Sequence, residues 1–328
     1  MSTTGDTVIQ THQLTRHFDQ VVAVEDLTLD VHAGEVFGFL GHNGAGKTTT
    51  VRLLNGVLVA TSGEAQVLGL DPLADGPDLR RQTGVLTETP SLDDRLTAIE
   101  TLTVYGALYD VPRQDLERRV HDLLAQFELG DRAGDLVGGF SKGMRQRLAL
   151  ARTLLHDPTV IFLDEPTAGL DPVGRRTVHD LIADLSRRDG RTVFLCTHDL
   201  AEAQKLCDRV GVMEHGRLVA LGTPEALAHE LQRGVRLEIE LDAEPDPKVL
   251  ASVAPATTPD GAAPAWDEVA RVARVWLPTR AAIPGLVEAL VSAGSHIYGV
   301  TRQEPSLEDV YFALHDDGET GRVTGGGI

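Results

Sequence analysis

Cysteine is scarce in this sequence, with only Cys196 and Cys207 among 328 residues. Two cysteines build no disulfide framework and match no zinc-ligand spacing, so the sequence indicates a reducing compartment. The chain also has no run of about 18 uninterrupted apolar residues, the length that a membrane-spanning helix needs. Its N-terminus lacks a charged-then-apolar signal pattern. We therefore expect a cytosolic protein whose connection to any membrane goes through a partner.

Positive charge is in deficit: 30 Lys and Arg stand against 49 Asp and Glu, for a formal net charge of −19. Such a surface repels a phosphate backbone at long range, which argues against nucleic acid as a partner. A local basic site, such as one for a nucleotide, stays compatible with this charge. Hydrophobic residues make up 42 % and charged residues 24 %, the balance of an ordinary globular protein that can bury a core.

Short apolar runs alternate with helical patterns from residue 7 onward, which predicts an α/β domain over residues 1–233. The apolar, β-branched runs have the length of buried strands and lie at residues 35–40, 159–163 and 192–196. Between about residues 89 and 150 the pattern changes to amphipathic helices. We expect that stretch to form a helical subdomain inserted into the α/β core.

A different pattern follows residue 233. Apolar and charged residues alternate over residues 235–241, the period of a half-buried strand. Further strands and helices are expected at residues 272–277, 284–293 and 297–300, and from Ser306 onward. These elements predict a small α+β domain over residues 234–314. Residues 315–328 include a Gly-rich tail that we expect to be disordered.

A glycine-rich run, GHNGAGKT from Gly41 to Thr48, matches the phosphate-loop pattern G-x-x-x-x-G-K-[ST] in full. It follows a predicted strand and opens a helix, and this context argues against a chance glycine turn. The glycines let backbone N–H groups converge on phosphates, and the helix N-terminus adds partial positive charge. Lys47 supplies a full charge, and the Thr48 hydroxyl can coordinate Mg²⁺. We expect the nucleotide to be bound here by Gly41, Asn43, Gly44, Ala45, Gly46, Lys47, Thr48 and Thr49.

Two acids, Asp164 and Glu165, end the apolar strand at residues 159–163. Strand ends of this kind lie at the sheet edge where α/β folds bind ligands. We expect Asp164 to hold Mg²⁺ and Glu165 to polarise the attacking water as a general base. The alternative is a charged strand end that faces solvent.

A serine and a glycine, Ser141 and Gly143, open a predicted helix at Phe140-Ser141-Lys142-Gly143-Met144. Hydroxyl, free amides and helix dipole could form a second anion site there. Taken alone, an ordinary serine N-cap explains this pattern better.

The order of these motifs resembles that in the ATP-binding subunits of ABC transporters, over residues 7–233. The fold implied is a P-loop ABC-type ATPase core with a helical subdomain and a small C-terminal α+β domain. The resemblance implies that Ser141 and Gly143 close over ATP bound to a second copy, and that Asp171 links the two sites. It also implies that His198 contacts the γ-phosphate and that Phe18 stacks on adenine. A core histidine and a packed phenylalanine are the plainer alternatives for those last two.

The chain departs from the family pattern in two places. Lys142 and Met144 replace the first Gly and the Gln of the usual Leu-Ser-Gly-Gly-Gln, and Glu88 stands where the family has a loop Gln. A carboxylate ligates Mg²⁺ at least as well as an amide, so the expected metal set is Thr48, Glu88 and Asp164. Both departures resemble ATPases of bacterial drug and antibiotic export systems, such as the daunorubicin exporter's, as does the ending at residues 304–311.

The function implied is hydrolysis of ATP with Mg²⁺, with Lys47, Glu165 and His198 as the catalytic residues. The expected partners are a second copy of this subunit and separate membrane-spanning permeases, at the cytoplasmic face of the membrane. The work would be export of drugs, antibiotics or lipid-like compounds. One alternative is an ABC-type ATPase acting on the ribosome or nucleic acid, although such relatives generally carry two ATPase units or a long coiled coil. Another is a nucleotide-switched regulatory module, against which the intact Glu165 argues.

Overall fold

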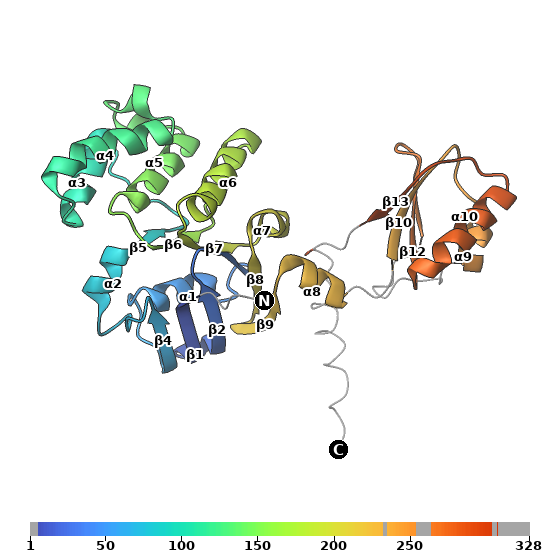
Figure 1. Cartoon of the computed structure of the whole chain (residues 1–328), viewed down its shortest axis with the longest axis horizontal. Coiled ribbons are helices and arrows are strands. Elements are labelled where there is room, and N and C mark those ends of the chain that lie inside the picture. Colours follow the sequence, from blue (N-terminus) through green and yellow to red (C-terminus); the bar gives the residue numbers. More distant parts are fainter. Residues whose placement is uncertain (1–5, 232–234, 254–263, 304–306, 308–328) are drawn as a thin grey trace, which may run out of the picture. The chain divides into compact units, whose positions relative to one another are not determined.

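A computed structural model (Figure 1) describes residues 6–231, 235–253, 264–303 and 307 of the chain. The chain divides into two compact units, Met1–Thr223 and Pro224–Ile328, whereas the sequence predicts a boundary at residue 233. The difference arises because helix α8 (Pro224–Leu231) groups with the second unit. The helix predicted from Ser306 and the tail at residues 315–328 lie outside the described residues, apart from Leu307.

The first unit contains a six-stranded sheet that consists of β3 (Val36–Leu40), β5 (Thr83–Leu86), β6 (Val160–Asp164), β7 (Thr192–Thr197), β8 (Arg209–Glu214) and β9 (Arg217–Gly222). The strand order is β5-β6-β7-β3-β8-β9, and all neighbours run parallel except β8 and β9. β3, β6 and β7 are buried at every residue, as strands covered on both faces are. These are the three strands that the sequence predicts, and the α/β fold is confirmed.

A smaller antiparallel sheet consists of β1 (Thr7–Phe18), β2 (Val21–His32) and β4 (Ser62–Val67), in the order β2-β1-β4. Its buried side chains, such as Leu27, join one apolar cluster with phenylalanines of the large sheet. The Phe194 ring lies at the centre of these aromatics, with its centroid 5.5 Å from Phe37, 5.1 Å from Phe39 and 5.6 Å from Phe162. This cluster fixes β3, β6 and β7 against one another, and the ends of these strands carry the predicted site.

The helices of the first unit are α1 (Lys47–Leu54), α2 (Gly76–Gln82), α3 (Ala98–Leu108), α4 (Arg113–Gln126), α5 (Lys142–Leu154), α6 (Pro172–Arg187) and α7 (Leu200–Leu206), with short 3₁₀ turns at Gly130–Arg132 and Val137–Gly139. α3, α4 and α5 pack on one another in the stretch where the sequence predicts a helical subdomain (Figure 1). Short polar side chains begin four of the helices: Thr97, Ser141, Asp171 and Asp199 each accept a hydrogen bond from a backbone N–H in the first turn. None of the helices in the described ranges is long and apolar enough to span a bilayer.

The second unit contains a four-stranded antiparallel sheet of β10 (Val235–Leu241), β11 (Ala265–Asp267), β12 (Val272–Leu277) and β13 (Ile297–Gln303), in the order β11-β12-β10-β13. Its other elements are α8, α9 (Pro247–Val253), α10 (Ile283–Ser292) and a 3₁₀ turn at Arg280–Ala282. Leu237 and Ile239 of β10 pack with Leu286 and Leu290 of α10, while the alternate residues of β10 are more exposed. The α+β class predicted for this part of the chain is confirmed.

Candidate functional site

The glycine-rich run forms the turn between β3 and α1. Gly46 has a φ of +111°, and a Cβ atom there would lie 2.3 Å from the carbonyl oxygen of Ala23 on β2, so glycine is required. The neighbouring Ala45 is fully buried, and its carbonyl accepts a hydrogen bond from the Gly216 N–H at 3.1 Å. Strand β2 and the turn between β8 and β9 therefore hold the loop in place, and the first amides of α1 have no partner within the helix, as an anion site needs.

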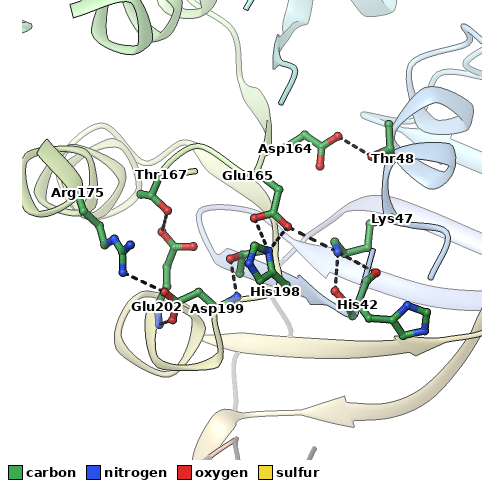
Figure 2. Close-up of polar contacts among 12 residues, drawn as sticks. His42, Lys47, Thr48, Asp164, Glu165, Thr167, Arg175, His198, Asp199 and Glu202 are labelled. Atoms are coloured by element: carbon green, nitrogen blue, oxygen red, sulfur yellow. Dashed lines mark hydrogen bonds and ion pairs between the residues drawn. The ribbon is translucent and has the colours of Figure 1, made fainter. Parts of the chain in front are cut away.

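The Lys47 side chain is buried, with 6 % of it exposed, and folds back over the turn that precedes it. Its Nζ donates hydrogen bonds to the carbonyl oxygens of Gly41 at 2.5 Å and His42 at 3.3 Å (Figure 2). The next residue, Thr48, donates from Oγ1 to Asp164 Oδ2 at 2.7 Å. The loop and the end of β6 are thus joined directly by side chains.

Glu165, which follows the last residue of β6, connects the loop to the end of β7. Its carboxylate lies 3.6 Å from Lys47 Nζ and 2.9 Å from His198 Nδ1, and Figure 2 draws both contacts as dashed lines. The residue has a φ of +51°, a left-handed conformation that costs a non-glycine residue about 1–3 kcal/mol. A hydrogen bond from its N–H to the Cys196 carbonyl, 2.9 Å long, holds it there. Lys47, Thr48, Asp164, Glu165 and His198 therefore form one cluster.

Burial changes the electrostatics of one member of this cluster, Asp164. Burial raises the pKa of Asp164, against the opposite effects of the Thr48 hydrogen bond and the Lys47 charge. The negative charge of Glu88 raises that pKa further. Glu88 is exposed and follows β5, the neighbour of β6 in the sheet. It therefore acts on Asp164 through its charge, on the side of the site where the sequence predicts a metal.

The predicted second anion site begins α5. Ser141 is exposed, and its Oγ accepts a hydrogen bond from the Met144 N–H at 3.3 Å, the ordinary capping contact. Gly143 is half-buried beside Leu170. Asp171 likewise caps α6 by accepting from the Gly174 N–H at 2.8 Å. Ser141 and Asp171 thus each form these hydrogen bonds within their own helix. These bonds are separate from the ones that join the loop cluster.

The Phe18 ring, at the end of β1, is 39 % exposed. The guanidinium carbon of Arg16 lies 4.4 Å from its centroid and covers one face, a cation–π contact. Arg16 is itself fixed by a hydrogen bond from Nη1 to the Val59 carbonyl at 2.9 Å. Arg16 therefore holds the ring on one face.

Three further residues beside the cluster, Thr167, His179 and Glu202, were not singled out from the sequence. Glu202 is buried on α7 and is hydrogen-bonded to the other two. An acid on a short amphipathic helix ordinarily faces solvent, so its position carried no sequence signal. Its contact with Thr167, which follows Glu165 and Pro166, is visible only in three dimensions.

A glycine-rich loop between a buried parallel strand and a helix, with two acids at the end of a nearby strand, defines a P-loop nucleotide-binding protein. The chain matches the ABC transporter family model over residues 24–168. A fluoroquinolones export ATP-binding protein of Mycobacterium tuberculosis is 44 % identical over 241 residues, covering 73 % of this chain and 78 % of that protein. The daunorubicin resistance ATP-binding protein DrrA3 of Streptomyces coeruleorubidus is 36 % identical over 326 residues, covering 97 % and 98 %.

A solved ATP-binding subunit of an ABC transporter is 32 % identical, with a TM-score of 0.63 over 68 % of this chain and 93 % of that chain. The chain therefore belongs to the ABC transporter family, as an ATP-binding subunit. The resemblance noted in the sequence is confirmed.

The raised pKa of Asp164 predicts an effect on stability. A carboxyl whose pKa is raised by folding stabilises the fold only while protonated, and this contribution is lost as the pH rises from 3.8 through the folded-state pKa. At neutral pH the burial of Asp164 therefore destabilises the nucleotide-free protein. We expect Asp164→Asn to raise the thermal unfolding midpoint at pH 7, by an amount that shrinks as the pH is lowered towards 4. Differential scanning fluorimetry over this range is the measurement.

The matched control is Asp122→Asn, which changes an exposed acid on α4 and should leave the midpoint nearly constant. An Asp164→Asn protein no more stable than wild type at pH 7 would contradict the assigned effect of burial.

Proposed function

We propose that this chain binds ATP with Mg²⁺ and hydrolyses it to ADP and phosphate, and that this reaction drives a separate membrane-spanning partner. The observation that carries the proposal is the placement of Glu165. Its carboxylate is held between the phosphate-loop lysine, 3.6 Å away, and His198, 2.9 Å away. A carboxylate so placed can accept a proton from a water that attacks a phosphate bound at the loop.

Nucleotide binding would use the loop residues Gly41, Asn43, Gly44, Ala45, Gly46, Lys47, Thr48 and Thr49. The Lys47 ammonium, already turned towards the loop, would neutralise phosphate oxygens. Thr48 Oγ1 and Asp164 Oδ2, 2.7 Å apart, offer the hard oxygen ligands that Mg²⁺ prefers, which supports a metal at this point. Glu88 would add a third oxygen ligand from the neighbouring strand end. When bound, Mg²⁺ would supply positive charge that offsets the charge of the phosphates.

Water activation would fall to Glu165 and His198. An ionised carboxylate only accepts hydrogen bonds, so His198 donates to it from Nδ1. This contact orients the carboxylate, and it leaves Nε2 of the imidazole for a γ-phosphate oxygen. His198 is 60 % exposed on its side chain, which supports a role facing a ligand. Lys47 Nζ, 3.6 Å away, holds the Glu165 carboxylate at the loop, where it can accept a proton from the water.

The remaining predicted residues would act with a second copy of the chain. Ser141 and Gly143, at the exposed start of α5, would close over the nucleotide of the other subunit, and Asp171 at the start of α6 would link the two sites. The free amides and dipole of a helix N-terminus suit a phosphate. Phe18 would stack on adenine with the ring face that Arg16 leaves uncovered.

The work done would be export at the cytoplasmic face of the membrane, where the subunit binds separate permeases. The relatives at 44 % and 36 % identity are named for fluoroquinolone export and daunorubicin resistance. The daunorubicin relative also aligns with the second unit, because the match covers 97 % of this chain. These two facts support drugs, antibiotics or lipid-like compounds as the transported class.

Substitutions of Lys47 and Glu165 separate binding from hydrolysis. Lys47→Ala should weaken ATP binding about ten- to a hundredfold, because a hydrogen bond to a charged group contributes about 1.5–3 kcal/mol. Glu165→Gln should bind ATP normally and lower kcat about a hundredfold or more, the contribution of a general base. Phosphate release and fluorescent-nucleotide binding give the two quantities. Wild-type turnover in Glu165→Gln would remove this residue from the role of base.

The state of assembly should depend on ATP. If the starts of α5 and α6 complete the site of a second copy, Glu165→Gln with ATP and Mg²⁺ should accumulate as a dimer, since bound ATP is not consumed. The nucleotide-free protein should be largely monomeric. Light scattering after size exclusion distinguishes the two, and Glu165→Gln carrying Ser141→Ala should dimerise more weakly. If the measured molar mass does not change when ATP is added, Ser141 has only its role as a helix cap.

The role of Glu88 at the metal can be tested by titration. Glu88→Gln replaces a full negative charge by a neutral amide, and the Coulomb attraction to a divalent ion falls accordingly. We expect the Mg²⁺ concentration for half-maximal hydrolysis to rise several-fold at saturating ATP, with nucleotide affinity in EDTA nearly unchanged. Superimposable Mg²⁺ curves for Glu88→Gln and wild type would make Glu88 an ordinary exposed loop residue.

A further inference from the structure

One buried carboxylate ties together three segments that carry the proposed hydrolytic residues. Glu202 on α7 has a side chain that is 1 % exposed. Its Oε1 accepts a hydrogen bond from Thr167 Oγ1 at 2.9 Å (Figure 2). The same oxygen lies 2.9 Å from His179 Nε2, which donates because a carboxylate oxygen accepts. Thr167 and His179 are themselves buried, at 6 % and 7 % exposure. The three residues form a polar contact behind the site, away from solvent.

Each member of this contact lies a short distance along the chain from a residue of the proposed site. Thr167 is two residues after Glu165, and Glu202 is four residues after His198. His179 lies on α6, whose first turn is capped by Asp171. The Glu202 carboxylate therefore couples the strand end of the proposed base to the helix that follows His198 and to the helix that Asp171 begins.

Neighbouring hydrogen bonds make the same junction more rigid. Asp199 caps α7 by accepting from the Glu202 N–H at 2.9 Å, and Arg175 of α6 donates to Asp199 at 3.3 Å. On the other side, Gln146 of α5 donates to the Pro166 carbonyl at 2.6 Å, from a buried position. The segment from Glu165 to Thr167 is thus held by α5, and through Glu202 by α6 and α7.

The choice of a carboxylate at this position disfavours a purely structural explanation. The second oxygen, Oε2, is buried without a hydrogen-bond partner among the described residues, and an unsatisfied buried oxygen destabilises a fold. Apolar side chains would fill this volume at lower cost in desolvation. The carboxylate contributes directional hydrogen bonds, and its two contacts fix the angle and spacing of the segments that they join.

We propose that Glu202 is a positioning residue for hydrolysis, which sets the placement of Glu165 relative to His198 through Thr167 and His179. The inference rests on the proposed ATPase function. It concerns turnover and not nucleotide affinity, because the phosphate loop is held by other contacts, those of Gly46 with β2 and of Ala45 with Gly216. Glu202 touches no reacting atom in this scheme.

The test compares kcat with ATP affinity in variants that keep the volume of the contact. Thr167→Val removes one donor without changing side-chain size, and should lower kcat about ten- to a hundredfold, the effect of displacing a reacting group by about 1 Å. The Kd for ATP, from fluorescent-nucleotide binding, should stay within about twofold, since affinity depends on the loop. Glu202→Gln keeps an acceptor oxygen and His179→Gln keeps a donor at the position of Nε2, so both should retain more turnover than Glu202→Ala or His179→Leu.

Two controls make the outcome decisive. Lys205→Ala changes an exposed residue on the same helix and should match wild type. Adding Thr167→Val to Glu202→Ala should lower kcat no further, because both changes break one contact. Full turnover in Thr167→Val, or a parallel loss of kcat, ATP affinity and thermal stability, would overturn the positioning role. No turnover in the wild-type protein would instead overturn the proposed ATPase function, and this inference with it.

Discussion

The alignment of three strand ends is the constraint on which the site depends. In the parallel sheet Asp164 of β6 pairs with Cys196 of β7, and Leu40 of β3 pairs with Thr197 of β7. The three strands therefore stop at the same level, and each delivers its next residues to one edge. A shift of register by one residue would turn each side chain to the opposite face and separate Lys47 from Glu165. The aromatic cluster around Phe194 keeps this register. Packing in the core therefore determines where the site residues lie at the edge of the sheet.

Each buried charged group at this edge of the sheet is stabilised by neighbouring polar or charged groups. Lys47 would be unfavourable in its buried position without the loop carbonyls and Glu165. Asp164 is kept by Thr48 and by the nearby lysine, and Glu165 is kept in a left-handed conformation by the Cys196 carbonyl. The nucleotide-free protein thus carries a local instability that a ligand with compensating charges can relieve, a common property of binding sites.

The sequence predicts the class of the fold and the phosphate loop because both depend on patterns of residues that are close together in the chain. Apolar strand runs mark β3, β6 and β7, and the alternation over residues 235–241 marks β10. The boundary between the units differs from the predicted one because α8 groups with the second unit, and the helix-forming residues of α8 do not indicate with which unit it packs. Glu202 is missed for a different reason: its burial follows from α7 packing against Thr167 and His179, residues 35 and 23 positions away in the chain. Such long-range contacts produce no periodic pattern of apolar residues in the sequence.

The contacts of the phosphate loop have a consequence for the order in which the protein becomes functional during synthesis. Ala23, which packs against Gly46 of the loop, is synthesised before the loop. The hydrogen bond that holds Ala45, however, comes from the Gly216 N–H, and the Gly216 carbonyl in turn accepts from the Glu25 N–H. Translation must therefore pass residue 216, close to the end of the first unit, before the loop has its full support. Domains generally fold as units while the chain emerges from the ribosome. On this basis the nascent chain gains its nucleotide site as one of the last features of the first unit, whereas the second unit can still be unmade.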